Sequence, residues 1–185
     1  MDFLTQIVET IDRKVESYTQ SKAFRTHGLI HILPDDQLFP FAVNPQTNEP
    51  AVPDDKYDVS LYHRYEGDAF EPIDGRSDDF KLQQVSNMRL VAFGDRKRLQ
   101  YTDFQFCQYL AYAILGRVNV KTAKMIFCQP VTSVTNALEV LNQELPGIEK
   151  IALDRIMLVS INYSVNINYN KSCLNLCEPK PLICK

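Results

Sequence analysis

The sequence lacks several features that would point directly to a function. It has no tryptophan and only six glycines, and neither a glycine-rich phosphate loop nor a Gly-x-Ser-x-Gly nucleophile elbow occurs in it. No apolar stretch approaches the ~18–20 residues that cross a bilayer. The first residues also lack the basic start and apolar stretch of a secretion signal. We therefore expect a protein without membrane association that stays in the compartment where it is made.

An excess of charge of either sign is missing too. The net charge of −3 over 185 residues gives no overall attraction to nucleic acid or to an anionic membrane. The hydrophobic fraction of 45% and the charged fraction of 23% are typical of a globular protein. A chain of this length buries roughly 70% of its unfolded surface, so it needs neither a disulfide nor a metal to fold.

Five cysteines are present, which is an odd number. Two of them lie in strongly apolar segments, where a free thiol behaves as a small hydrophobic side chain. Together with the missing secretion signal, this favours a reducing compartment. The five are Cys107, Cys128, Cys173, Cys177 and Cys184.

Hydrophobic periodicity predicts three helices. Apolar residues recur every three or four positions over residues 3–18, whereas Asp12 and its charged neighbours lie mostly off this stripe. A second helix is expected from a cap at Thr102 or Asp103 to about Gly116. Its side chains are apolar almost all round, which is typical of a helix inside a core or inside an assembly. A short third helix is expected at 134–145.

Alternation and short apolar runs predict the strands. The clearest alternation covers 161–169, where Ile, Tyr and Val alternate with Asn and Ser, and it indicates a long strand with a polar outer face. The order of elements indicates an α+β fold, a mainly antiparallel sheet packed by an N-terminal helix, a central helix and one short helix. Further strands are expected at 27–33, 38–43, 57–65, 85–93 and 118–129, with a short pairing segment at 99–102.

Residues 1–170 are expected to form a single α+β domain. Two polar stretches at 44–56 and 66–79, which contain proline, glycine and many acidic residues, predict long loops. Loops of this length in a compact domain are frequently functional. Residues 171–185 predict an extended, cysteine-rich C-terminal tail, because Pro179 and Pro181 disfavour a helix there.

Two candidate metal motifs are incomplete. His27 and His31 have the four-residue separation of a zinc protease, but no glutamate follows the first histidine and the segment favours a strand. Cys173, Cys177 and Cys184 offer three of the four donors of a structural zinc site. We interpret the histidines as structural and the tail cysteines as free thiols, and we expect no metal and no cofactor.

A loose nuclease pattern is the main enzymatic alternative. Pro53-Asp54 is followed by Asp79-Phe80-Lys81, and a Mg²⁺-dependent nuclease needs two carboxylates for the metal and a lysine near the attacking water. Both acids lie in expected loops, within a stretch rich in acidic residues, so a solvated acidic surface is the favoured interpretation. We expect no enzymatic activity.

Opposite charges are segregated along the chain. A basic run at an expected hairpin tip, residues 96–98, is interpreted first as a solvated turn. Copies arranged head to tail could also pair this run with the acidic loops, and such a heterologous contact closes into a ring when the rotation permits. The expected subunit-interface residues are Arg96, Lys97, Arg98, Asp54, Asp55, Asp78, Asp79, Cys173 and Cys177.

The layout resembles the small neck and tail-completion proteins of tailed bacteriophages, the head–tail connector and tail-terminator ring components. The resemblance consists of the helix at 3–18, strands with long polar insertions, the central helix near 104–115 and a closing strand. That strand reads Ile161-Asn162-Tyr163-Ser164-Val165-Asn166-Ile167-Asn168-Tyr169. The Asn-, Ile- and Tyr-rich ending is also similar to proteins of phages that infect Bacteroidota, including the crAss-like group.

This resemblance implies a virion structural protein of the neck or tail region, made in the host cytoplasm. It implies a homo-oligomeric ring, sixfold or twelvefold, with the portal or adjacent neck and tail proteins as partners and DNA only passing through the channel. The family has no catalytic signature, so no functional residue is carried over. A generic bacterial assembly or binding domain is the alternative, ahead of the nuclease.

Overall fold

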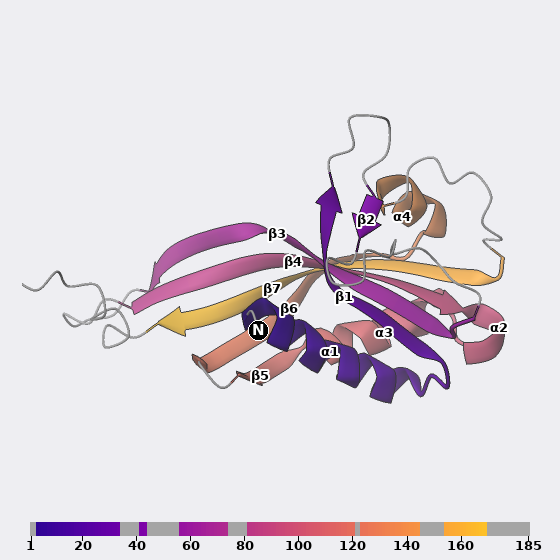
Figure 1. The fold of residues 1–185 in the computed structure, drawn as a ribbon, viewed down its shortest axis with the longest axis horizontal. Helices are drawn as coiled ribbons and strands as arrows, with labels where there is room; N and C mark the ends of the chain where they lie inside the picture. The colour runs from indigo at the N-terminus through magenta and orange to yellow at the C-terminus, as the bar shows by residue number, and fades with distance from the viewer. Residues whose placement is uncertain are drawn as a thin grey trace, which may run out of the picture.

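The computed structural model describes residues 3–33, 41–43, 56–73, 81–120, 123–144 and 154–169. Over these ranges the chain forms a curled, mixed sheet with helices packed on both of its faces (Figure 1). Most strand pairs are antiparallel. The expected α+β class, with a mainly antiparallel sheet, is therefore confirmed.

The sheet brings together strands that are distant in the sequence. Its order is β2-β1-β3-β4-β7-β6-β5, and only β1 and β3 run parallel. The last of the described strands, β7, thus lies between β4 and β6. The described helices are α1 (Phe3–Thr19), α2 (Arg96–Leu99), α3 (Asp103–Ile114) and α4 (Ala137–Glu144). The described strands are β1 (Phe24–Leu33), β2 (Phe41–Val43), β3 (Val59–Ile73), β4 (Lys81–Asp95), β5 (Gly116–Val120), β6 (Ala123–Val134) and β7 (Ile156–Tyr169).

The larger hydrophobic core lies between one face of the sheet and the helices α1 and α3 (Figure 1). The apolar stripe of α1 is buried there, as its periodicity predicts. Every second residue of β7 points into the same core, which confirms the alternation expected for the closing strand. The β7 residues of this core are Met157, Val159, Ile161, Tyr163, Val165 and Ile167.

A smaller core lies on the opposite face, under α4. Val140 and Leu141 of α4 pack there against side chains from four strands. The side chain of Asn136 accepts hydrogen bonds from the backbone N–H groups of Leu138 and Glu139, so it caps the start of this helix. The strand residues of this core are Ile30, Tyr62, Val91, Phe93 and Leu158.

Side-chain caps place the short helices. Thr102 and Gln105 form a capping box, which confirms the expected start of α3. The segment 99–102 does not form the expected strand. Asp95 accepts hydrogen bonds from the backbone N–H groups of Lys97 and Arg98 and so starts the one-turn helix α2 directly after β4. The single strand expected at 118–129 is also wrong, because the chain forms two antiparallel strands, β5 and β6, there.

The loop predicted at 66–79 is wrong in its first half, because β3 continues as a strand to Ile73 and pairs with β4. Two residues that favour loops fit this strand for local reasons. Gly67 follows a register shift after Tyr65 and has φ +123°, which suits a bulge. Pro72 lies where β3 pairs only with β4, because the pairing with β1 ends at Arg64, and an edge strand tolerates proline.

We call the paired segments 65–73 of β3 and 81–87 of β4 the arm. In Figure 1 the arm extends to the left, away from α2 and α4 and beyond the helix layers. Residues 74–80, which connect its two strands, lie outside the described residues, as do 44–55 of the other expected loop and the tail from 170 onward. The fold therefore has a helix-covered body at one end and the arm at the other.

Candidate functional site

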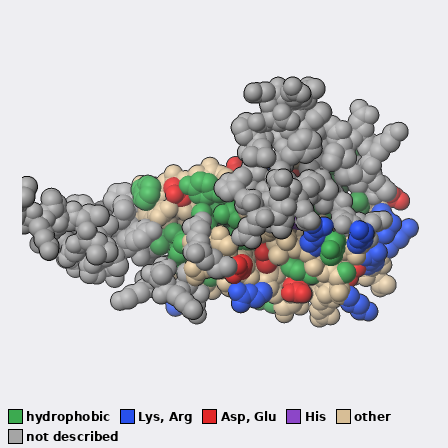
Figure 2. Space-filling model, in the orientation of Figure 1, with side chains coloured by type: hydrophobic (Ala, Val, Ile, Leu, Met, Phe, Trp, Pro, Cys, Tyr) green, Lys and Arg blue, Asp and Glu red, His purple; other side chains and the backbone are tan. Residues whose placement is uncertain are grey.

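The basic run 96–98 forms α2, at the end of the molecule opposite the arm, where Lys and Arg side chains gather (Figure 2). Arg96 binds Asp103 with 2.7 Å between Nη2 and Oδ1, and Arg98 lies 3.3 Å from Asp58. Two of the three cations in the run are therefore neutralised within the chain. No described residue pairs with the side chain of Lys97.

Asp95 is the centre of this cluster. Burial alone would raise the pKa of Asp95, but hydrogen bonds from Arg155 and from the backbone of Arg98 and Lys97 outweigh it, and the pKa is lowered. Arg155 donates from both Nε and Nη2 to Asp95 Oδ2, at 3.0 and 2.9 Å. Such a charge-assisted pair ties the start of β7 to the end of β4.

Asp58 corrects part of the sequence interpretation, because it belongs to the stretch interpreted as a solvated acidic surface. It is buried, and its Oδ2 accepts hydrogen bonds from the backbone N–H groups of Lys22 and Ala23, at 3.0 and 3.1 Å. It therefore holds the connection between α1 and β1. The remaining expected interface residues, Asp54, Asp55, Asp78, Asp79, Cys173 and Cys177, lie outside the described residues.

A buried polar chain crosses the larger core. His63 is fully buried, with Nε2 2.9 Å from Asp12 Oδ1 and Nδ1 2.7 Å from the Tyr163 hydroxyl. Thr26 donates to the second oxygen of Asp12 at 2.6 Å. Burial, with smaller contributions from Cys128 and Asp12, raises the pKa of Tyr163. The tyrosine thus keeps its proton, and the His63 ring joins it to Asp12 through hydrogen bonds at both ring nitrogens.

This series of hydrogen-bonded side chains has the acid–base–hydroxyl order of a catalytic triad, but no substrate can reach it. All three side chains are buried below the helix layer. Cys128, in the same core, has its pKa raised to about 12 by burial, so it stays a thiol. A fully hydrogen-bonded network of this kind fixes one arrangement of α1 against the sheet. We assign it a structural role.

A second buried cluster lies on the opposite face of the sheet. Arg64 and Arg89 stand directly opposite each other on β3 and β4. Glu144, the last residue of α4, accepts from both at 3.1 and 2.7 Å and also from the Tyr62 hydroxyl at 3.1 Å. Glu66 contacts the same two arginines. This Glu144 cluster lets two like charges sit side by side and fastens α4 to the sheet.

The arm exposes large side chains without a covering layer. Phe70 is 61% exposed, and Tyr65 is also largely exposed. Asp68 lies on the same face of the arm, where its two oxygens accept from Ser86 at 2.6 Å and from Gln84 at 2.9 Å. Beyond Arg64, β3 has no described neighbour other than β4, so its outer backbone groups form a free edge.

Helix α3 is the second exposed apolar element. Its inner side packs in the core, but Phe104 and Tyr112 are 68% and 62% exposed on its outer side, and Leu115 just after it is exposed as well. The sequence predicted a helix apolar almost all round, and here only one side has found a partner within the chain. Single exposed apolar residues are ordinary, but a row along one helix marks a contact surface.

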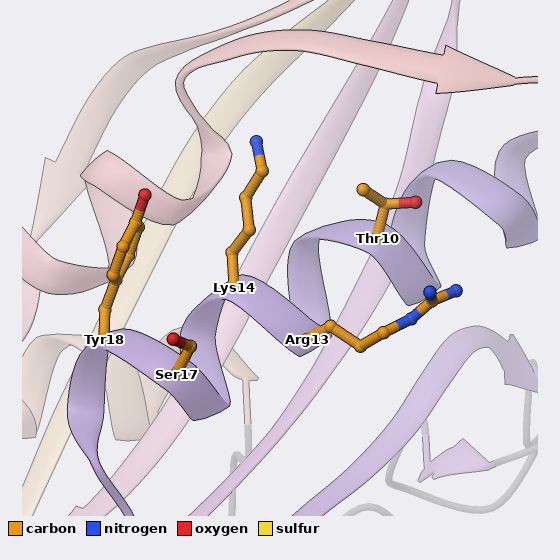
Figure 3. A pocket seen from close by; sticks show the side chains of 5 residues that line it. All are labelled: Thr10, Arg13, Lys14, Ser17 and Tyr18. Carbon is orange, nitrogen blue, oxygen red and sulfur yellow. The ribbon is translucent and has the colours of Figure 1, made fainter.

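An open groove of about 310 Å³ lies along α1, next to this surface. Figure 3 shows Lys14 and Tyr18 extending in the same direction from α1, toward the segment that joins α3 to β5. Lys14 is half-buried, and none of the described carboxylates pairs with it. Arg13 has only a loose contact with Glu9, at 3.8 Å. The lining residues are Thr10, Arg13, Lys14, Ser17 and Tyr18.

The part of the chain that the structure describes contains no assembled metal site. No group of three His, Cys, Asp or Glu side chains that could hold a metal ion occurs there. His27 lies on β1, which is a strand as expected, at a position followed by Gly28 with φ +64°. The nuclease pair Asp54 and Asp79 lies outside the described residues. None of the described helices is long and apolar enough to cross a membrane.

Sequence reasoning missed the polar residues that matter most to the fold. Asp12 was expected off the buried stripe and is instead buried beside His63, because its partner comes from a strand 51 positions away. Glu144 has no local signal either, since Arg64 and Arg89 are 80 and 55 positions distant.

Comparisons with known proteins add no relative. No family model matches the sequence, and a search of curated proteins finds no match.

Proposed function

We propose that this protein is a structural subunit of a virion, a ring-forming head–tail connector or tail-completion component that joins the capsid portal to the tail. The observation that carries the proposal is the contrast between its polar and apolar surfaces. Its described polar clusters hold the fold together, while large apolar side chains stand exposed on the arm and on α3. Exposed apolar rows suit protein contacts better than chemistry on a small molecule.

Ring formation is supported by the positions of these surfaces. The arm and the outer side of α3 differ in structure and lie on different parts of the molecule (Figure 1). Contact between two unlike surfaces on identical copies is heterologous, and it gives a closed ring when the rotation closes. The resemblance in layout to phage neck proteins supports a sixfold or twelvefold ring, with the portal and adjacent neck or tail proteins as partners and DNA only passing through.

The experiment that tests the proposal is a mass measurement of the purified protein by native mass spectrometry and light scattering. It is made with the protein alone and again after co-expression with the products of neighbouring genes. A closed ring of one defined copy number is expected in at least one of these conditions. A protein that stays monomeric in both contradicts the proposal and favours the generic binding domain. Mg²⁺-dependent DNA cleavage, abolished by Asp79→Ala, would contradict it in favour of the nuclease.

A further inference from the structure

We propose that the arm of one copy docks into the groove of α1 and against the outer side of α3 in the next copy. Asp68 of the arm then faces Lys14 and Arg13, and the aromatic side chains of the arm pack against Tyr18, Tyr112 and Leu115. The inference rests on the proposed ring and names the contact that closes it. The occupant of the groove is thus a second copy of this chain.

The arm presents one suitable face. Tyr65 pairs with Met88, a residue of the larger core, and beyond the register shift Asp68 pairs with Ser86 and Phe70 with Gln84. Tyr65, Asp68 and Phe70 therefore project from the same face of the sheet, the face that α1 and α3 cover in the body. Two hydrogen bonds hold the Asp68 carboxylate in place, and no described cation neutralises it. This face offers one fixed negative charge between two exposed aromatic rings.

The receiving surface has the opposite character. Lys14 and Arg13 provide positive charge at the groove. A half-buried ammonium group without a carboxylate partner loses hydration and gains nothing in return within its own chain. An aspartate from a neighbour would supply the missing partner. Tyr18 and Tyr112 supply the apolar area around it.

Charge complementarity selects this pairing over a symmetric contact between two α3 helices. Two copies of the groove surface facing each other would bring Arg13 and Lys14 of both together, and like charges across an interface repel each other. Among its described side chains the arm brings no unpaired cation, because Arg64 and Arg89 at its base are bound by Glu66 and Glu144. The contact is therefore head to tail, as a ring requires.

The test is a charge swap followed by sedimentation velocity. Asp68→Lys and Lys14→Glu are prepared singly and together, with Asp154→Lys as a matched control, because Asp154 is an exposed carboxylate at the α2 end of the molecule, away from the arm. Each single reversal is expected to weaken association about tenfold or more, and the double variant is expected to restore it, because the pair regains opposite charges. The control should assemble like the unmodified protein. Thermal melting checks that every variant is folded.

A second measurement covers the case in which Asp68→Lys disturbs the arm itself. A photoreactive phenylalanine analogue placed at position 70 is mixed with isotopically labelled protein and irradiated. Cross-links to α1 or α3 peptides of the labelled copy are expected. If both single variants still form the ring and the cross-links lie outside α1 and α3, the proposed contact is wrong but the proposed ring is not contradicted. If the unmodified protein is monomeric alone and with its neighbours, the ring and the contact both fail.

Discussion

The body and the arm share β3 and β4, yet they are held together in different ways. In the body, consecutive residues of β4 such as Leu90 and Val91 are both fully buried, because helices cover both faces of the sheet. In the arm, the same strand carries half-buried Gln84 and Val85 opposite the exposed Phe70 and Ala69 of β3, and of its described residues there only Ser86, next to the body, is buried. The body is stabilised mainly by the apolar surface that it buries, whereas the arm is stabilised mainly by the backbone hydrogen bonds between its strands.

This difference shows why a strand pair continues beyond its core. A ladder that covers little apolar area adds little stability in water, so the arm, which is joined to the rest of the sheet by the pairing of β4 with β7, contributes less stability than the body. Its length and exposed aromatic residues are explained if another molecule covers it. Substitutions should therefore separate the two regions, with stability lost in the body and association lost in the arm.

The largest expected effect is in the body. Leu90→Ala removes a fully buried side chain from the larger core and should lower the free energy of unfolding by about 2–5 kcal/mol. Val85→Ala on the same strand, in the arm, should cost less than about 1 kcal/mol because its side chain is only half-buried. Urea unfolding followed by circular dichroism measures both. Equal losses at the two positions would remove the distinction between body and arm.

The next effect is at the junction of the two regions. Glu144→Gln replaces the carboxylate that holds Arg64 and Arg89 together, and its side chain is only 1% exposed. Leaving two facing guanidinium groups underneutralised should cost about 2–3 kcal/mol. The same unfolding experiment measures this loss. Glu139→Gln makes the same replacement on the exposed side of α4 and, as a control, should change stability by less than about 0.5 kcal/mol.

A smaller loss is expected where the sheet meets α3. A Cβ atom at Gly94 would lie 2.9 Å from Met157 Cε and 3.1 Å from the Phe106 ring. Gly94→Ala should therefore cost about 1–3 kcal/mol by overpacking, since both neighbours are fully buried. The double variant Gly94→Ala with Phe106→Leu should recover part of the loss seen for Phe106→Leu alone. Additive losses in this cycle would show that the two side chains do not compete for space.

Acid should reduce the stability that Asp95 contributes at the α2 end of the body. The pKa of Asp95 is lowered in the folded protein from its ordinary value of 3.8. Its carboxylate therefore contributes stability above the unfolded-state pKa, and this contribution is lost as the pH falls through the lowered folded-state pKa. Asp95→Asn should cost about 1 kcal/mol at neutral pH, because the charged hydrogen bonds from Arg155 are weakened. The difference from the unmodified protein should shrink on acidification. A difference independent of pH would assign the loss to packing.

The smallest effect on stability is expected in the arm. Phe70→Ala should change the free energy of unfolding by less than about 0.5 kcal/mol, because the ring is 61% exposed. The same variant should weaken self-association, since a central aromatic side chain of an interface often dominates binding. Unfolding and sedimentation measured on one preparation compare the two effects. A large loss of stability with normal association would reverse the roles given to body and arm.

The sequence allowed the elements with strong periodicity to be predicted. The stripe of α1, the cap of α3 at Thr102 and the alternation of β7 are local patterns, and the structure confirms them, although Tyr18 at the end of the stripe is exposed. The arm was predicted as a loop because Gly67 and Pro72 usually interrupt strands. Only the tertiary context, a bulge and a free edge, makes them acceptable. The buried pairs Asp12–His63 and Glu144–Arg89 were not predicted. In each pair a helix residue contacts a strand residue that is distant in the sequence, so no sequence spacing marks the contact.

The central position of β7 also governs when the chain can fold during its synthesis. Without β7 the sheet consists of two separate pieces, β2-β1-β3-β4 and β6-β5, because β7 alone joins β4 to β6. A nascent chain therefore cannot close the sheet until residues 156–169 have left the ribosome, and until then β4 and β6 carry unpaired edges. Synthesis of β7 therefore acts as a checkpoint, because the two pieces of the sheet become one only after this strand has paired with both.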